Sequence, residues 1–197
     1  MLLPGSYANG FAPRDGQPLY PSLWKGCVGA WNPGLGVSGL TLRDQSGFNR
    51  HGTLTNGPTW AASSGKYALS FDGVDDYVTS PYSTQYLTGT EYSFSMWYCP
   101  TNVTGAHGLF SMWDFTSGAI AWSSGTSLIF QSGNSAHRIT VTNVFTIGMF
   151  THLVFMNREG NTSVSINGVL SSTTIAASTV NGSAQPLLIS ANNTGGV

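Results

Sequence analysis

The chain has 197 residues, of which 41% are hydrophobic and only 8% are charged, with a formal net charge of −1. This length fits one domain with a sizeable core. The near-neutral balance excludes the basic footprint of a nucleic-acid-binding protein, and no stretch approaches the roughly 20 apolar residues of a membrane-spanning helix. Neither a nucleic-acid partner nor membrane insertion is therefore expected.

The first 23 residues differ from the rest of the sequence. They contain four prolines and show little periodicity, so residues 1–23 are interpreted as an extended N-terminal arm before a single domain at 24–197. The arm is either a loosely packed terminus or an anchor that lies on a neighbouring subunit. The start lacks the cationic residues and the apolar stretch of a secretory signal, so none is recognised.

Short strand patterns separated by turn residues dominate the domain, and no window of ten or more residues favours a helix. Strands are expected at or near residues 27–31, 66–71, 76–80, 92–98, 108–113, 119–122, 127–131, 137–142, 149–156, 162–166 and 186–190. This spacing is typical of an all-β fold. We expect a two-sheet antiparallel jelly-roll sandwich.

Several strands indicate which side chains face the core. YSFSMWY, residues 92–98, alternates hydrophobic and polar positions, and MFTHLVFM, residues 149–156, reads as a central strand buried on both faces. Asn167-Gly168 predicts a tight hairpin turn. The residues expected to point inward are Phe71, Phe94, Met96, Tyr98, Ile139, Val141, Leu153, Phe155, Val164, Ile166 and Leu188.

Three of the eight acidic residues fall within FDGVDDYV, residues 71–78. Asp72, Asp75 and Asp76 should repel one another unless a metal ion, the backbone N–H donors of a tight turn or solvent exposure compensates. The loop RDQSGFNRHG, residues 43–52, also offers hard oxygen ligands for calcium through Asp44 and Asn49.

Catalytic patterns are sparse, so no enzyme is expected. The four histidines show no metal-binding spacing, and Asp114 reads as a turn residue. The match of residues 34–39 to G-x-G-x-x-G has neither a strand before it nor a helix after it, so it does not indicate a nucleotide site.

Four segments in order resemble the laminin-G-like, concanavalin A-like jelly-roll superfamily, especially its bacterial and phage LamG-like branch. They are WKGCVGAWNPGLGVSGLTLRDQSGFNRHGTLTNG, KYALSFDGVDDYV, YSFSMWYCP and FTHLVFMNREGNTSVSINGV, within residues 24–190. The resemblance implies two facing antiparallel sheets and a domain that binds glycans or proteins, often with calcium, and is usually not an enzyme. It also places the acids of residues 71–78 in a turn between two strands.

Two kinds of site residue follow from these implications, acidic residues and aromatic residues. Asp72, Asp75 and Asp76 are expected to cap the turn by accepting backbone N–H bonds, with calcium as the alternative for any of the three and for Asp44 and Asn49; no cofactor is required. Tyr82, Trp113 and Trp122 are candidates for a sugar-stacking platform, although aromatic side chains in a sandwich often belong to the core.

The sequence departs from the family at its end, because no strand resembling G-x-I-D-E-V-x-I-Y follows residues 186–196. Either the polypeptide continues, or the sandwich has an open slot that another chain fills. We expect a phage virion surface component, such as a capsid decoration, tail or fibre protein, made in the host cytoplasm, assembled with other virion subunits or as a homo-oligomer, and binding host or environmental glycans. The alternative is an extracellular carbohydrate-binding module of a larger secreted bacterial protein.

Overall fold

The computed structural model describes residues 24–63, 65–81, 91–113, 118–132, 137–158, 161–171, 175–176 and 186–190. The expected arm, residues 1–23, lies outside this part, so its role stays a prediction. Within it the chain forms antiparallel strands in two large sheets and one small one, which confirms the predicted all-β jelly-roll sandwich. The same residues include no helix long and apolar enough to cross a lipid bilayer.

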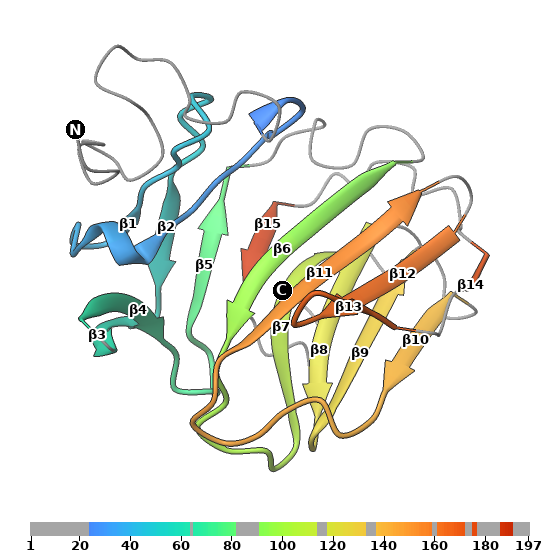
Figure 1. Ribbon diagram of the computed structural model, residues 1–197. Helices are drawn as coiled ribbons and strands as arrows, with labels where there is room; N and C mark the ends of the chain where they lie inside the picture. The colour runs from blue at the N-terminus through green and yellow to red at the C-terminus, as the bar shows by residue number, and fades with distance from the viewer. Residues whose placement is uncertain are drawn as a thin grey trace, which may run out of the picture.

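The larger sheet has eight strands, and Figure 1 shows it behind the smaller one. In spatial order the strands are β1 (Thr41–Leu42), β2 (Gly52–Thr55), β5 (Tyr77–Ser80), β15 (Leu187–Ile189), β7 (Ala106–Trp113), β8 (Gly118–Ser124), β9 (Ser127–Ser132) and β10 (Arg138–Val141). β15, late in the sequence, lies between β5 and β7, so this sheet joins distant parts of the chain.

The second sheet lies in front of the first in Figure 1. Its strands are β13 (Val169–Leu170), β12 (Asn161–Ile166), β11 (Thr151–Arg158) and β6 (Tyr92–Tyr98), with β14 (Ile175–Ala176) also paired to β12. A separate hairpin of β3 (Thr59–Ser63) and β4 (Lys66–Ser70) stands to one side, and η1 (Pro33–Leu35) is a short 3₁₀ helix.

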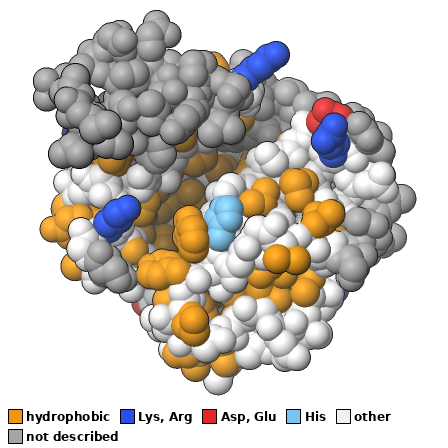
Figure 2. Space-filling view, viewed as in Figure 1, with side chains coloured by type: hydrophobic (Ala, Val, Ile, Leu, Met, Phe, Trp, Pro, Cys, Tyr) orange, Lys and Arg blue, Asp and Glu red, His pale blue; other side chains and the backbone are white. Residues whose placement is uncertain are grey.

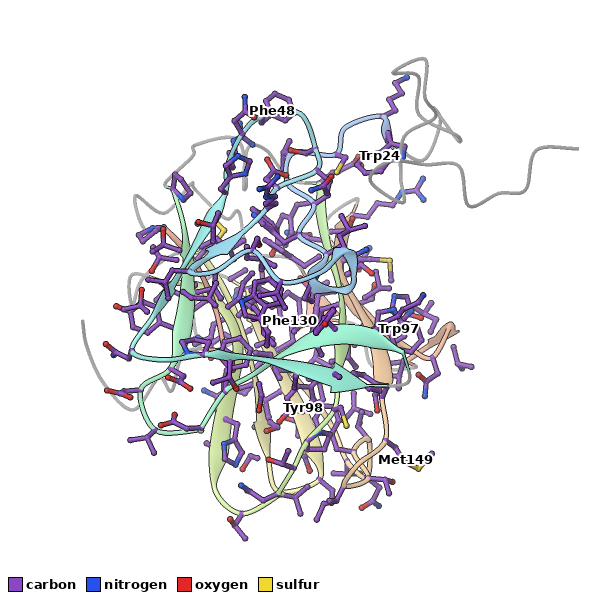
Figure 3. All side chains as sticks on the ribbon, turned by 90° about the vertical axis from the view of Figure 1, so that its left-hand side faces the viewer. Trp24, Phe48, Trp97, Tyr98, Phe130 and Met149 are labelled. Atoms are coloured by element: carbon purple, nitrogen blue, oxygen red, sulfur yellow. The ribbon has the colours of Figure 1, made fainter. Side chains whose placement is uncertain are left out.

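Phenylalanines from both sheets meet in the main core. Phe94 of β6 stacks on Phe110 of β7 with ring centroids 4.5 Å apart, and Phe155 of β11 lies 5.0 Å from Phe130 of β9. Phe130 and Phe155 are completely buried, and Figure 3 shows Phe130 in the interior. Because these contacts cross from one sheet to the other, they fix the two layers face to face.

A second, smaller core lies under β1, β2 and β5. Leu42, Leu54 and Val78 are buried there, and Trp60 and Phe71 pack against them. This cluster anchors the β3–β4 hairpin, which contributes Trp60, to the inner side of the larger sheet.

Most of the expected inward positions are confirmed. Ile139, Leu153, Phe155 and Val164 are completely buried, and the partly buried members packed on a core are Phe71, Phe94, Met96, Tyr98, Val141 and Ile166. The prediction for Leu188 was wrong by one residue. Leu187 and Ile189 pack on the main core, so the strand alternation turns Leu188 to the other face.

Two strand predictions need correction. Residues 27–31 form no strand in the structure, and Trp31 makes only an isolated bridge with Asp44, because side-chain bonds to the Asp44 carboxylate and from the Trp31 indole hold this segment. β11 is central in its sheet but is buried on one face only, since His152, Val154 and Met156 are only half-buried.

The predicted Asn167-Gly168 turn joins β12 and β13. Both residues have positive φ, 50° and 81°, as a type I′ hairpin turn requires. The prediction of this hairpin is confirmed.

Candidate ligand-binding surface

The outer face of the five-stranded sheet carries an exposed tryptophan in the middle of a structured region. On β6, Phe94, Met96 and Tyr98 face the core, so Ser95 and Trp97 face outward. The Trp97 side chain is 64% exposed. Figure 3 shows Trp97 and Met149 on the same side of the molecule, whereas neighbouring Tyr98 points into the interior.

His152 of β11 lies directly opposite Trp97 in the sheet. The two rings have centroids 4.9 Å apart with 32° between their planes. The His152 Nε2 atom is 2.9 Å from the Ser95 hydroxyl, which restrains the imidazole beside the indole. The pair therefore forms a continuous aromatic shelf instead of two independent surface side chains.

Asn167 holds the backbone beneath this shelf. Its N–H donates to the His152 carbonyl at 2.8 Å, and its Oδ1 accepts from the His152 N–H at 2.9 Å. These two bonds tie the β12–β13 turn to the start of β11. We call Ser95, Trp97, His152 and Asn167 the Trp97 surface.

Hydrophobic side chains extend the exposed area around the Trp97 surface. Figure 2 shows hydrophobic side chains gathered on this face around a histidine. The exposed hydrophobic residues of the β10–β11 loop and of β13 are Ile147, Met149, Phe150, Val169 and Leu170. Arg158 is the one charged residue in β6, β11, β12 and β13. This combination of apolar area, hydroxyls and amides suits an uncharged ligand.

Trp122 of β8 lies on the outer face of the opposite sheet, away from Trp97. Ala119 and Ala121 face the core, so the alternation turns Trp122 outward, where it is half-buried. The Arg138 guanidinium lies 5.2 Å from the centre of a Trp122 ring. Gln131 holds the guanidinium there, because its Oε1 accepts hydrogen bonds from Arg138 Nε at 3.2 Å and from a terminal nitrogen of Arg138 at 3.0 Å. Arg138 thus occupies a ring face that a sugar would need.

The other two predicted platform side chains cannot be compared with Trp122. Tyr82 lies outside the described residues, and so does the side chain of Trp113, whose backbone belongs to β7. Their roles stay predictions.

Asp44 organises the loop that contains Asn49. Its Oδ1 accepts from the backbone N–H groups of Ala30 and Ser46 at 2.9 and 2.8 Å, and its Oδ2 accepts from the Ser46 hydroxyl and the Arg50 N–H at 2.7 and 2.9 Å. Four donors around one carboxylate leave it little capacity for a metal ion.

These bonds also set the charge of the group. Partial burial alone raises the pKa of Asp44, but the hydrogen bonds from Ala30, Ser46 and Arg50 together hold that pKa below its ordinary value. Asn49 is exposed at a positive φ of 56° in the same loop. The geometry of Asp44 is that of a structural loop anchor.

In the β4–β5 turn, Asp72 and Asp76 take the expected capping positions, whereas Asp75 donates its backbone N–H to Asp72 Oδ1 at 3.4 Å. Asp72 Oδ1 accepts from the Val74 N–H at 2.8 Å, and the buried Asp76 accepts from the Asp72 N–H at 2.9 Å. The bond from Val74 is the main cause that lowers the pKa of Asp72. Ligand atoms of Asp72, Asp75 and Asp76 lie within 4.8 Å of one another, so these residues are also the group that would converge on a cation.

No carboxylate lies on a sheet face in the described part of the chain. All its strands lack aspartate and glutamate. A glycosidase requires two carboxylates that face each other across a bound sugar. The described strands provide no such pair.

The Trp97 surface was missed from the sequence, although one signal was present. The alternation in residues 92–98 that places Phe94, Met96 and Tyr98 inward also places Trp97 on the polar side of the strand. Trp97 and His152 are 55 positions apart, so their pairing depends on the register between β6 and β11, which single-strand alternation does not encode.

Comparison with solved structures finds the same fold in botulinum neurotoxin receptor-binding regions. One similar structure belongs to work on the cell entry of botulinum neurotoxin type C, which depends on interaction with two ganglioside molecules. It is 17% identical to this chain with a TM-score of 0.60, and the match covers 79% of this chain and 42% of that one. The binding domain of neurotoxin DC matches in complexes with rat synaptotagmin II (18% identity, TM-score 0.57, 76% and 40% covered) and with SialylT (16%, 0.53, 76% and 40%). The chain spans about two fifths of their length.

Comparison with curated protein sequences found no match. Comparison with family models matched residues 72–197, more than half of the chain, to a laminin G model described as the concanavalin A-like lectin/glucanases superfamily. The match begins at Asp72, later than the resemblance noted from Trp24 onward. The chain belongs to the concanavalin A-like lectin/glucanases superfamily.

Proposed function

We propose that this protein is a non-enzymatic binding module that recognises uncharged glycans through the Trp97 surface. The observation that carries the proposal is the 64% exposed Trp97 indole, fixed beside His152 on a face rich in hydroxyl and amide groups. A tryptophan so exposed on a strand contributes little to the core. Its solvent-facing area is available to a ligand.

The chemistry of a sugar ring matches this surface. The C–H groups of a pyranose pack against an aromatic ring, while its hydroxyls exchange hydrogen bonds with neighbouring polar groups. Covering about 80 Å² of indole contributes about 2 kcal/mol at 25 cal/mol per Å². One such site binds weakly, so several copies on one particle or surface would be needed for firm attachment.

The comparisons support a binding role without fixing its ligand. The name of the superfamily includes lectins, and the descriptions of two similar structures name gangliosides and SialylT as molecules bound by those neurotoxins. Sequence identities of 16–17% carry the fold and not the ligand, so the glycan class here rests on the Trp97 surface itself.

A hydrolytic role is less well supported than binding. Glucanases share the name of this superfamily. In the described part of the chain, however, Asp44 accepts four hydrogen bonds, and Asp72 and Asp76 cap a turn. These carboxylates have structural tasks away from the Trp97 surface.

A glycan array of uncharged oligosaccharides tests the proposal, with the full chain and its Trp97→Ala variant compared at equal concentration. The expected result is binding to one or more uncharged glycans that the variant loses while it keeps the melting temperature of the parent. Equal binding by both proteins would overturn the proposed site. Release of reducing sugar from a bound polysaccharide would overturn the non-enzymatic role.

We further propose, from the sequence, that the module works on the surface of a phage virion; the alternative is an extracellular module of a larger secreted bacterial protein. The support is the proline-rich arm, whose Leu19, Tyr20 and Leu23 could anchor the domain on a neighbouring subunit. Deletion of residues 1–23 should leave the sandwich folded and abolish incorporation into particles. Normal incorporation of the truncated chain would contradict this assignment.

Calcium binding also stays a prediction. Asp72 and Asp75 of the turn are better placed for it than Asp44 and Asn49, because the Asp44 oxygens already accept four hydrogen bonds. A calcium ion bound only by the folded state would raise the melting temperature. An unchanged melting temperature with calcium and with chelator would count against a structural ion.

A further inference from the structure

Among the described strands, β6 is the last one of its sheet, and the direction of its backbone groups follows from its pairing with β11. The His152 N–H and C=O both bond to Asn167, on the β12 side of β11. Successive residues of a strand direct these groups to opposite sides, so Leu153 directs its own toward β6 and exchanges hydrogen bonds with its partner, Met96.

The same alternation runs along β6. Met96 and the other even-numbered residues bond toward β11, so the N–H and C=O groups of Ser93, Ser95 and Trp97 point to the opposite side. Among the described residues, no strand other than β11 pairs with β6. The N–H and C=O groups of these three alternate residues therefore point away from β11, and an added strand could form hydrogen bonds with them.

The side chains of β6 show the same incompleteness. On β11, the inward-facing Leu153 and Phe155 are completely buried, whereas on β6 the inward-facing Phe94 and Met96 are only partly buried. Both strands face the same core and carry side chains of similar size. The difference in burial follows the pairing: in the part of the chain that the structure describes, β11 has a strand on each side and β6 has a strand on one side.

The space beside β6 favours one extended segment over a whole domain. The larger sheet continues past β6 in Figure 1 with β15, β5 and β2, and the β3–β4 hairpin stands beyond them. Figure 2 shows the surface hollowed to the left of the histidine, with hydrophobic side chains in the hollow. If a second copy of the chain paired its β6 with this β6, the larger sheets of the two copies would overlap, because each extends past its own β6.

β6 also lacks the features that protect an edge strand. Residues 92–98 contain no charged residue and no proline, which natural sheets use to block pairing with other chains. Nothing in the sequence of this strand opposes the addition of another.

We propose that the β6 edge binds an extended, uncharged segment of a partner protein, which adds as a strand beside Ser93, Ser95 and Trp97. Apolar residues at alternate positions of the segment cover Phe94 and Met96, and small polar residues between them lie beside Ser93 and Ser95 on the outer face. This interaction uses the backbone of β6 and does not require the glycan-binding role of the Trp97 side chain.

The probe is a synthetic seven-residue peptide with valine at alternate positions and threonine between them, capped at both ends. Amide hydrogen exchange of the monomeric full chain is followed by NMR with and without saturating peptide. The expected result is a slowing of exchange of at least tenfold at the Ser93, Ser95 and Trp97 amides. Two N-methylated versions of the peptide, one methylated along each edge, serve as controls. The version whose methylated edge faces β6 should produce no slowing, because its N–H donors are removed.

A matched pair of variants completes the test. Ser93→Pro removes an edge-facing N–H without breaking the ladder to β11, and Ser93→Ala keeps that N–H. The expected result is loss of peptide binding in Ser93→Pro only, with glycan binding through Trp97 retained in both variants. The proposal is overturned if these three amides are already protected in the free monomer, because the chain itself then fills the edge. It is also overturned if peptide binding survives both proline substitution and N-methylation.

Discussion

Trp97 and Trp122 both point outward from a strand, one on each outer face of the sandwich. The residues around the two indoles differ. Trp97 is 64% exposed and lies beside the His152 ring and the Ser95 hydroxyl. Trp122 is half-buried under the Arg138 guanidinium. Each strand alternates in the same way, so the difference comes from residues of other strands: His152 of β11 lies opposite Trp97, and Arg138 of β10 reaches Trp122 across β9.

This comparison separates a structural tryptophan from an available one. The attraction between Arg138 and the Trp122 ring is satisfied within the protein, and Gln131 fixes the cation in place. The Trp97 indole has a ring neighbour at its side and solvent over much of its surface. Exposure and cross-strand partners, more than residue type, decide which aromatic can serve a ligand.

The largest expected effect is on glycan affinity. Trp97→Ala removes the stacking surface and should weaken binding of an uncharged glycan about 30-fold, equivalent to about 2 kcal/mol. Trp122→Ala should change the same affinity less than twofold. Isothermal titration calorimetry of both variants with one oligosaccharide measures the contrast, and a larger loss in Trp122→Ala would reverse the comparison.

The second expected effect is on stability and runs in the opposite direction. Trp122→Ala removes half-buried apolar area together with the contact to Arg138, and should lower the free energy of unfolding by about 1–2 kcal/mol. Trp97→Ala should stay within about 0.5 kcal/mol of the parent, as expected for an exposed site. Urea denaturation with a common slope measures both values. Equal losses would show that Trp97 is also structural.

Gln131→Ala sharpens the explanation for Trp122. Gln131 is buried and accepts two hydrogen bonds from Arg138, so its loss should release the guanidinium and cost about 1 kcal/mol. The double variant with Trp122→Ala should lose less than the sum of the single variants, because both substitutions disturb one arrangement. Strict additivity in a double-mutant cycle would contradict the coupling.

The smallest expected effect concerns His152. His152→Phe keeps a ring beside Trp97 and removes the contact between Nε2 and the Ser95 hydroxyl. Glycan affinity should fall about two- to threefold, equivalent to about 0.5 kcal/mol. Calorimetry with the oligosaccharide used for Trp97→Ala provides the measurement, and a loss as large as that of Trp97→Ala would make His152 the main contact.

The architecture was predictable from the sequence because alternation is a property of single strands. The pattern in residues 92–98 and the Asn167-Gly168 turn identified β6 and the β12–β13 hairpin. The two-residue strand β1 is too short to show a period, and residues 27–31 are held by Asp44 and by the Trp31 indole instead of by a ladder. At β15, which of Leu187 and Leu188 faces the core depends on the register of this strand with β5 and β7.

The candidate site was less predictable than the fold, since it depends on which strands become neighbours. The turn position of Asp72 was predictable because its hydrogen-bond partners lie within four positions in the sequence. Trp122 was selected and Trp97 was passed over because their ring partners come from other strands. Arg138 of β10 reaches Trp122 across β9, and His152 of β11 lies opposite Trp97. Local capping can be inferred from a short stretch of sequence, and a shared surface requires the register.

The most direct test of the central claim follows the indole N–H signals of the six tryptophans by NMR during titration with an uncharged oligosaccharide found on the glycan array. Single Trp→Phe variants assign the signals. The Trp97 signal is expected to shift progressively to saturation while the Trp122 signal stays in place. A saturable shift of Trp122 with Trp97 unchanged would place the glycan on the other sheet and contradict the account.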